Sequence, residues 1–544
     1  MHGSFFSVSA VTYSRRHFLQ HASLAATATL VAPRVARAHP FLIRSVPGRG
    51  GEPDLASLAA SAVDAARQAG ATYADARITL TRNQSGVPWS ESEERAFGVR
   101  ALVNGYWGFL ASAVWTSDEA VRLAHGAVAQ ARAYSRGKQR VVDLGPAPTV
   151  RNGEWVMPVT YDPFDIPIGE KSDVMAAFVD YATRYQPGIG TSTYMAFVRQ
   201  QQLFVSSDGA SWAQTVYQSL ASFALSYRGE YHTGLGQGGA GADGLGPVGR
   251  GWEVVAESGL MDQIPQLIVE AEQARHRAPF DVGRYDVVCS AEAMATMLDA
   301  TLGGATELDR ALGYEANASG TSYLSDPLGM LGTQVVAAPL VTVTANRSLA
   351  GGLGTVKWDH EGIVPEDFTL VNNGVLVDYQ TTREQAAWLA PYYQRIGRPV
   401  HSHGCANAQS ALSITMQHAP NLVLMPGTAS TSFEDLVAGT DSGVAVLGFT
   451  PTMDQQLLNG MGRRAVLREI KHGKLGRYLT GASALMFRAP EFWKNIVAIG
   501  GPASQQWFGM SRGKGQPGQS TAHTVGAVPA KVKQVSLIDP RRKV

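Results

Sequence analysis

Apolar and polar residues follow two different periods in the first part of the chain. Residues 53–70 carry apolar side chains at helical spacing and end at a glycine, which suits a helix C-cap. Residues 71–83 alternate as a half-buried strand does. Residues 95–113 indicate two strands joined by an Asn104-Gly105 hairpin turn. This order of helix and strands predicts an α+β domain with an antiparallel sheet.

Three more helices are predicted in the part that follows. Thr116 and Glu119 form a capping box that opens the first of them. Residues 171–185 and 260–278 have helical periodicity, and strands are expected between these two segments, near 193–229. Helices and strands therefore continue to alternate up to this point.

A change of pattern divides the chain in two. From about residue 284 onward, short β-branched strands separated by Gly, Asn and Pro dominate. A chain of 544 residues is also too long for one compact core. We therefore expect an N-terminal α+β domain over residues 52–275 and a β-rich C-terminal domain over residues 284–544.

One segment of the second domain combines helical spacing with residues that weaken helices. Residues 296–310 repeat apolar side chains at helical spacing, yet Gly303 and Gly304 stand in their middle. Each glycine costs roughly 1 kcal/mol relative to alanine inside a helix. A helix is predicted, and the two glycines raise the question of what it was built to hold.

The composition is that of a soluble globular protein. Hydrophobic residues make up 45% and charged residues 17% of the chain, and the 58 glycines favour a sheet-rich fold with many turns. The formal net charge of +1 offers no electrostatic footprint for nucleic acid. We therefore expect no nucleic-acid partner.

The first 38 residues have the parts of a twin-arginine export signal. Arg15 and Arg16 precede a short apolar stretch, and a small-x-small cleavage site stands just before His39. About 13 apolar residues are too few to span a hydrocarbon core of ~30 Å. A periplasmic or extracytoplasmic protein, not an integral membrane protein, is predicted. Without residues 1–38 the formal charge becomes −3, because this segment carries four arginines and no acid.

The chain contains two cysteines, Cys289 and Cys405. In an oxidising compartment they could form a disulfide, or they could be two buried free thiols. In either case the fold does not depend on a disulfide framework.

Two short motifs resemble known sites but lack essential parts. Gly234, Gly236 and Gly239 satisfy GxGxxG, but no predicted helix follows, which favours a loop over a dinucleotide site. His360-Glu361 opens the zinc motif HExxH, but no second histidine follows and a proline argues against a helix interior. A turn before a strand is predicted at this position.

A histidine and cysteine cluster is the candidate metal site. His401, His403 and Cys405 alternate along the chain, so in a strand their side chains would share one face and could bind zinc. Gly404 and the lack of a fourth ligand equally fit a surface or loop histidine cluster.

Several runs of the sequence, in order and spacing, resemble the TldD/PmbA (TldD/TldE) family along nearly the whole mature chain. These runs are GVRALVNGYWGF (98–109), KWDHEGIVPEDFTLVNNGVLVDYQTT (357–382), NLVLMPGTAS (421–430), ALMFRAPEFWKNIVAIGG (484–501) and GKGQPGQ (513–519). In this family, TldD-type subunits resemble zinc metallopeptidases that carry HExxxH on a helix and a later cysteine ligand. PmbA-type subunits lack these ligands and pair with a TldD-type subunit.

The resemblance implies that the metal site of this chain is degenerate. The two histidine ligand positions fall at Asp299 and Gly304, and the catalytic base position falls at Ala300. The cysteine position falls at Ser511 or Arg512. Leu298, Gly303, Glu307 and Asp309 match the family motif, and structural roles are expected for the two acids among them.

Three functions are compatible with these observations. The first is a non-catalytic subunit without its own metal, which forms a hetero- or homodimer with a TldD/PmbA-type chain and acts in peptide or protein processing. The second is a metallopeptidase with a relocated zinc site at His401, His403 and Cys405, with His523 as a further candidate. The third is a stand-alone extracytoplasmic protein that binds a peptide or another ligand.

Overall fold

The computed structural model describes residues 54–86, 88–135, 142–227, 230–235, 247–274, 276–480 and 484–539. The expected export signal, residues 1–38, lies outside these ranges, as do Gly236 and Gly239 of the glycine-rich segment. Within the described ranges, no helix is both long and apolar enough to cross a membrane.

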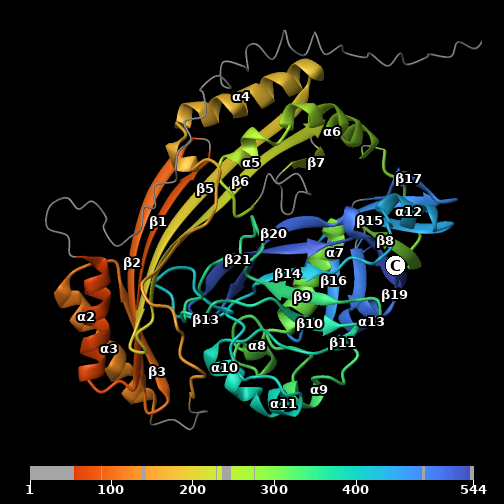
Figure 1. The fold of residues 1–544 in the computed structure, drawn as a ribbon. Helices are drawn as coiled ribbons and strands as arrows, with labels where there is room; N and C mark the ends of the chain where they lie inside the picture. Colours follow the sequence, from red (N-terminus) through yellow and green to blue (C-terminus); the bar gives the residue numbers. More distant parts are fainter. Residues whose placement is uncertain are drawn as a thin grey trace, which may run out of the picture.

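The N-terminal half is a long curved sheet with helices at its two ends (Figure 1). Its elements are α2 (Leu55–Gln68), β1 (Tyr73–Ser85), β2 (Ser90–Val103), β3 (Tyr106–Ser112), α3 (Ser117–Tyr134), β4 (Gly153–Val156), α4 (Ile168–Tyr185), β5 (Ile189–Ser206), β6 (Ser211–Tyr227), β7 (Glu230–Leu235), α5 (Glu253–Ala256) and α6 (Leu260–Ala274). The strand order is β3-β2-β1-β5-β6-β4, and β7 also pairs with β6. All pairs are antiparallel except β4 with β6.

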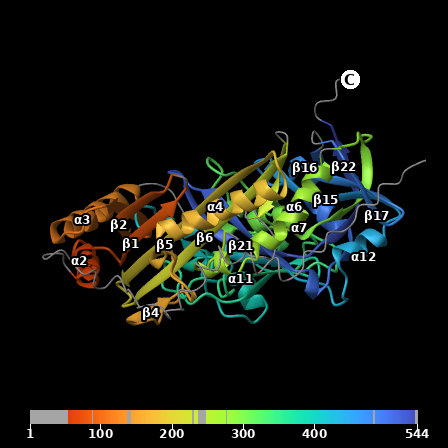
Figure 2. The same cartoon turned by 90° about the horizontal axis from the view of Figure 1, so that it is seen from above.

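Local sequence signals place these elements as predicted. Asn104 and Gly105 both have positive φ, at 52° and 80°, as a two-residue hairpin turn between β2 and β3 requires. The Thr116 side chain accepts a hydrogen bond from the Glu119 backbone N–H and caps α3. Two apolar clusters hold the helices: α2 and α3 pack at one end of the sheet, and α4 and α6 pack against β5 and β6 at the other (Figures 1 and 2).

The C-terminal half is rich in short strands. Its elements are β8 (Gly283–Cys289), α7 (Ala291–Leu298), η3 (Asp299–Gly303), α8 (Leu308–Ala311), α9 (Pro327–Met330), β9 (Val343–Asn346), β10 (Phe368–Asn372), β11 (Val375–Leu376), α10 (Arg383–Trp388), α11 (Ala390–Arg395), β12 (Ala406–Asn407), β13 (Met416–Gln417), β14 (Asn421–Leu424), α12 (Phe433–Ala438), β15 (Ser442–Met453), β16 (Asn459–Lys471), β17 (Lys474–Tyr478), β18 (Ala484–Arg488), α13 (Ala489–Lys494), β19 (Ile496–Ile499), β20 (Gln506–Lys514), β21 (Gln519–Ala527) and β22 (Ala530–Ile538).

Two larger sheets organise these strands. One has the order β11-β10-β9-β14-β21-β20, and the other has the order β15-β8-β22-β18-β16-β17 with β19 beside β22. Helix α7 contacts β14, β20 and β21 of the first sheet and β8 and β15 of the second, so it lies between them. The fold is therefore α+β, with an antiparallel N-terminal sheet and a β-rich C-terminal half, which confirms the predicted fold class.

The prediction of one α-helix over residues 296–310 is wrong. The α-helix α7 ends at Leu298, and residues 299–303 form a wider π-helical turn, η3, before the separate short helix α8. In a π-helical turn each backbone hydrogen bond spans five residues instead of four. The Gly303 carbonyl accepts a hydrogen bond from the Gln380 side chain at 2.6 Å. Single-turn π-helical segments occur frequently at functional sites.

Buried ion pairs join the two halves. Arg100 on β2 pairs with Asp75 on β1 at 2.7 Å and with Glu361 of the C-terminal half at 3.4 Å. His360 and Glu361 lie in a turn, as predicted, which ends at Gly362 with φ of 80°. His360 also contacts a guanidinium nitrogen of Arg77 at 3.1 Å, so this turn is a structural joint between the halves.

Both cysteines are buried free thiols. This outcome selects the second of the two alternatives left open by the sequence. Burial raises the pKa of each thiol to about 12, so neither is a reactive thiolate at neutral pH.

Candidate functional site

Residues that the resemblance assigns to the family's metal site gather where η3 meets the hairpin of β20 and β21. Asp299 opens η3, Arg512 lies near the end of β20, and His523 lies on β21. Arg512 and Asp299 stand 213 residues apart in the chain but form an ion pair. The fold therefore brings together the positions that the resemblance assigned to a histidine ligand and to the cysteine ligand.

Arg512 is the centre of this arrangement. Its Nη2 donates hydrogen bonds to the Asp299 carboxylate and to the Asp299 carbonyl, the latter at 2.6 Å. Its Nη1 donates to Glu307 Oε1 at 2.7 Å. His523 Nε2 lies 2.7 Å from Asp299 Oδ1, so that carboxylate is shared by a guanidinium and an imidazole. We call Asp299, Glu307, Arg512 and His523, together with Asp309 and Lys514, the ion-pair network.

Lys514 extends the network towards α8. Its Nζ donates to Asp309 Oδ1 at 2.8 Å, to Glu307 Oε2 at 3.2 Å and to the Gln417 side chain at 2.5 Å. Arg310 also pairs with Glu307, whose side chain is fully buried. Three carboxylates thus face three basic side chains, so the acidic and basic groups are equal in number inside the protein. The acids are Asp299, Glu307 and Asp309, and the basic residues are Arg310, Arg512 and Lys514.

Electrostatics holds Asp299 and Glu307 in their ionised form, whereas burial raises the pKa of Asp309. Burial alone would raise the pKa of Asp299, but the charges of Arg512 and His523 outweigh it and lower the pKa to about 2. Burial opposes ionisation of Glu307 as well, yet Lys514, Arg512 and Arg310 hold its pKa well below the usual value.

Glycines let Arg512 approach η3 closely. A β-carbon on Gly303 would lie 2.6 Å from Leu422 Cδ1 and 3.1 Å from Arg512 Nη2. A β-carbon on Gly304 would lie 2.8 Å from Leu457 Cδ1. These two contacts answer the question raised by the adjacent glycines, since a larger residue at either position would displace its neighbours.

The residues present do not fit a zinc ion at the family position. Zinc takes three or four protein ligands. The candidate donors near η3 are the carboxylates of Asp299 and Glu307 and the imidazole of His523. The Arg512 guanidinium is bonded to both carboxylates, so a cation already lies between them. Gly304 offers no ligand atom, and Ala300 offers no base.

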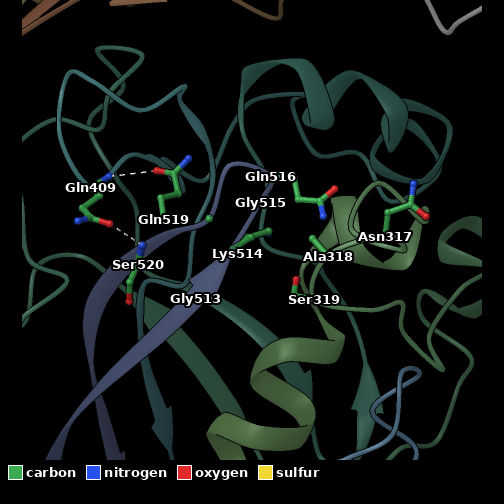
Figure 3. A pocket seen from close by; sticks show the side chains of 11 residues that line it. Asn317, Ala318, Ser319, Gln409, Gly513, Lys514, Gly515, Gln516, Gln519 and Ser520 are labelled. Carbon is green, nitrogen blue, oxygen red and sulfur yellow. Dashed lines mark hydrogen bonds between the residues drawn. The ribbon is translucent and has the colours of Figure 1, made fainter. Parts of the chain in front are cut away.

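Two cavities border the network. The first, of about 570 Å³, is shown in Figure 3, and it is lined by Asn317, Ala318, Ser319, Gln409, Gly513, Lys514, Gly515, Gln516, Gly518, Gln519 and Ser520. The second, of about 380 Å³, shares Asn317, Ala318, Gly515 and Gln516 with the first and reaches Arg100 and Trp107 of the N-terminal sheet. Polar and apolar side chains line both cavities, which suits a peptide or another ligand that carries both kinds of group.

The metal site predicted at His401, His403 and Cys405 has a different third residue in the structure. Residues 401–405 form a loop instead of a strand, with Gly404 at a φ of 75°. His401 and His403 come together with Glu366: their ligand atoms lie within 4.8 Å of one another. Cys405 is fully buried and does not belong to this group.

Sequence reasoning missed Lys514 and Glu366. Lys514 lies in the GKGQ run that supports the resemblance, but nothing in that run indicates that its charge balances Glu307 and Asp309. Glu366 stands 35 residues before His401, and no local spacing connects the two.

Comparisons with known proteins agree with the runs of sequence noted above. Residues 282–534 match the family described as PmbA/TldA metallopeptidase C-terminal domain. A metalloprotease of Methanothermobacter thermautotrophicus is 25% identical over 384 residues, which cover 69% of this chain and 76% of the relative. The chain belongs to the TldD/PmbA family. It is also 23% identical to a metalloprotease of Methanocaldococcus jannaschii over 391 residues, or 69% of this chain and 78% of that one.

Solved structures share the fold of this TldD/PmbA-family chain. TldE from Thermococcus kodakarensis superimposes with a TM-score of 0.63 at 12% identity, over 88% of this chain and 99% of its own. A protein described as a putative modulator of DNA gyrase from Thermotoga maritima gives a TM-score of 0.64 at 14% identity, over 89% and 99% of the two chains. The family is metallopeptidase-related, and the chain has its fold.

Proposed function

We propose that this chain is a non-catalytic, TldE/PmbA-like subunit that pairs with a zinc metallopeptidase homologue in peptide or protein processing. The observation that carries the proposal is the place of Arg512. Its guanidinium bonds Asp299 and Glu307, and Asp299 is one of the positions that the resemblance assigns to a histidine ligand of the family.

A guanidinium can replace the charge of a metal ion but not its chemistry. Arg512 neutralises the carboxylates around η3 and so keeps that turn folded. It stays protonated at all physiological pH values and has no open position at which to activate water. A zinc hydrolase also needs a general base, and alanine stands at that position here.

Export and partnership form the second part of the proposal. The twin-arginine signal expected over residues 1–38 would carry the chain out of the cytoplasm already folded. A homologous subunit without its own signal could cross with it. Replacing Arg15 and Arg16 by lysine should then leave the protein in the cytoplasm, as measured by fractionation of the host cells.

Purification from the native host tests the subunit proposal. The full chain, tagged at its C-terminus, should copurify with a TldD/PmbA-type chain that contains HExxxH, identified by mass spectrometry. Peptide hydrolysis should follow that partner through fractionation and be absent from this chain alone. An unrelated tagged twin-arginine substrate serves as the control. Hydrolysis by the isolated chain that is lost in His403→Ala would overturn the proposal in favour of the relocated-site alternative.

The two cavities beside Lys514 favour a second candidate, an extracytoplasmic binding protein for a peptide or another polar ligand. A ligand that binds only the native state raises stability by RT ln(1 + [L]/Kd). Thermal unfolding with a peptide library would detect it. Stabilisation of the isolated chain, with no HExxxH partner in native preparations, would select this candidate over the first.

A further inference from the structure

We propose that Glu366, His401 and His403 form a binding site for one divalent transition-metal ion, with zinc as the expected occupant. Glu366 lies in the segment just before β10, and the two histidines lie in the loop between α11 and β12. Their ligand atoms lie within 4.8 Å of one another. This site is separate from the degenerate family position and does not depend on the proposed function.

The donor set and its spacing suit zinc. Two imidazoles and one carboxylate are an established zinc ligand set, completed by water. His401 Nε2 lies 2.9 Å from Glu366 Oε2, and His403 Nδ1 contacts Glu366 Oε1. Tetrahedral zinc separates its ligand atoms by about 3.3 Å, so a small outward shift of these side chains makes room for the ion.

The ring of His403 is already oriented as a metal ligand. Its Nε2 lies 3.1 Å from Asp378 Oδ2, which leaves Nδ1 directed at Glu366. Histidine ligands in zinc sites usually hold their second ring nitrogen against a carboxylate in this way. Phe368 stacks on the imidazole with a centroid distance of 4.0 Å and an interplanar angle of 7°, which further restricts its rotation.

Asp378 is itself fixed by its surroundings. Its Oδ1 accepts hydrogen bonds from the Tyr393 hydroxyl at 2.7 Å and from the Tyr379 backbone N–H, and its Oδ2 accepts one from Arg398 at 3.1 Å. The carboxylate has no exposed surface. Because these hydrogen bonds hold Asp378 in place, its carboxylate fixes the orientation of the His403 ring before an ion arrives.

Exposure gives an ion a route to the site. The side chain of His403 is 1% exposed, whereas His401 and Glu366 are 36% and 35% exposed. The buried histidine therefore forms the inner end of the site and the other two ligands face solvent. None of the three lines either cavity beside Lys514, so an ion here would cross-link two loops instead of contacting a ligand in those cavities.

Zinc titration of the full chain tests the site. Chain stripped with a chelator is mixed with zinc chloride, desalted and assayed for zinc, and cobalt(II) is used in parallel to report tetrahedral coordination by its visible absorption. One zinc per chain is expected. His401→Ala and Glu366→Gln should each weaken binding at least 100-fold, and Asp378→Asn should weaken it roughly 10–100-fold. The test uses variants of His401 and Glu366, the two exposed ligands, because variants of the buried His403 could fail to fold.

Two controls make the result specific. His472→Ala removes an exposed histidine that pairs with Asp441 at 3.2 Å, and it should leave zinc binding unchanged. Asp299→Asn, which removes a carboxylate at the position the resemblance assigns to a family ligand, should also leave it unchanged, which separates the two sites. Equal zinc binding by wild type, His401→Ala and Glu366→Gln, or no zinc retained by the wild type, would overturn the proposal. Neither result would bear on whether a HExxxH partner copurifies.

Discussion

At the residue scale, Arg512 fills the space beside η3, where it pairs with Asp299 and Glu307. Alignment to the family motif left Ser511 and Arg512 as equal candidates for the cysteine position. On β20 these neighbours point to opposite sides, since Ser511 bonds the hydroxyl of Ser520 at the surface while Arg512 turns towards η3. Of these two candidates, Arg512 is therefore the one whose side chain faces η3.

Arg512→Ala should destabilise the protein strongly. It leaves Asp299 and the fully buried Glu307 without a main counter-charge, and breaking a buried ion pair by removing one partner costs about 3–5 kcal/mol. Denaturant unfolding measures the free energy of unfolding. The matched control is Arg184→Ala, whose i,i+4 pair with Asp180 is exposed and should cost less than about 1 kcal/mol. Equal effects of the two variants would contradict this account of the network.

Asp299 gives the stability a specific dependence on acid pH. Its pKa is about 2 in the folded chain, against an ordinary value of 3.8, so its ionised form is favoured by folding. Its contribution, about 2 kcal/mol, is fully present above pH 4 and is lost as the pH falls towards 2. Urea unfolding of wild type and Asp299→Asn at pH 7, 4 and 2.5 should show a stability difference that shrinks in acid. A difference independent of pH would refute the assignment.

At the element scale, the interruption of α7 by η3 depends on what packs against it. The apolar residues over 296–310 have helical spacing. This spacing predicts a helix but does not reveal where the α-helix ends. Gln380 and Arg512, from distant parts of the chain, bond the turn and hold its wider geometry. The caps and hairpins of the N-terminal half were predicted correctly because the residues that fix them are neighbours in sequence.

Gly303→Ala should destabilise this turn by about 1–3 kcal/mol, because the added methyl group meets Leu422 and Arg512. Gly169→Ala in α4 is the matched control: nothing lies within 4 Å of its β-carbon. That substitution should instead be neutral or stabilise by up to about 1 kcal/mol. Thermal and urea unfolding of both variants measures the contrast, and opposite signs are the expected result.

At the scale of the whole molecule, buried charges hold the two halves together. Glu361 of the C-terminal half accepts a hydrogen bond from the Arg383 backbone N–H at 2.9 Å and pairs with Arg100 of the N-terminal sheet. The sequence marked His360-Glu361 as an incomplete zinc motif, and the structure gives these residues a place in the joint. Their hydrogen bonds and the charge of Glu361 therefore stabilise the contact between the halves.

Glu361→Ala should lower the free energy of unfolding by about 3 kcal/mol, since Arg100 and the Arg383 N–H both lose a buried acceptor. Glu491→Ala, which removes an exposed partner of Arg488, should change it by less than about 1 kcal/mol. Calorimetry of the two variants provides the comparison. A loss at Glu361 no larger than that at Glu491 would mean that the joint contributes little to stability.

The sequence by itself determined the hairpin turn and the helix cap of the N-terminal half. The division into two domains and the loss of family ligands at Asp299, Ala300 and Gly304 stay predictions. Periodicity, caps and turn residues act between neighbours, so they can be read along the chain. Only the tertiary structure decided which side chains meet. Arg512 reaches Asp299 across 213 residues and Glu366 reaches His401 across 35, because sheet pairing and loop packing, not local spacing, set those distances.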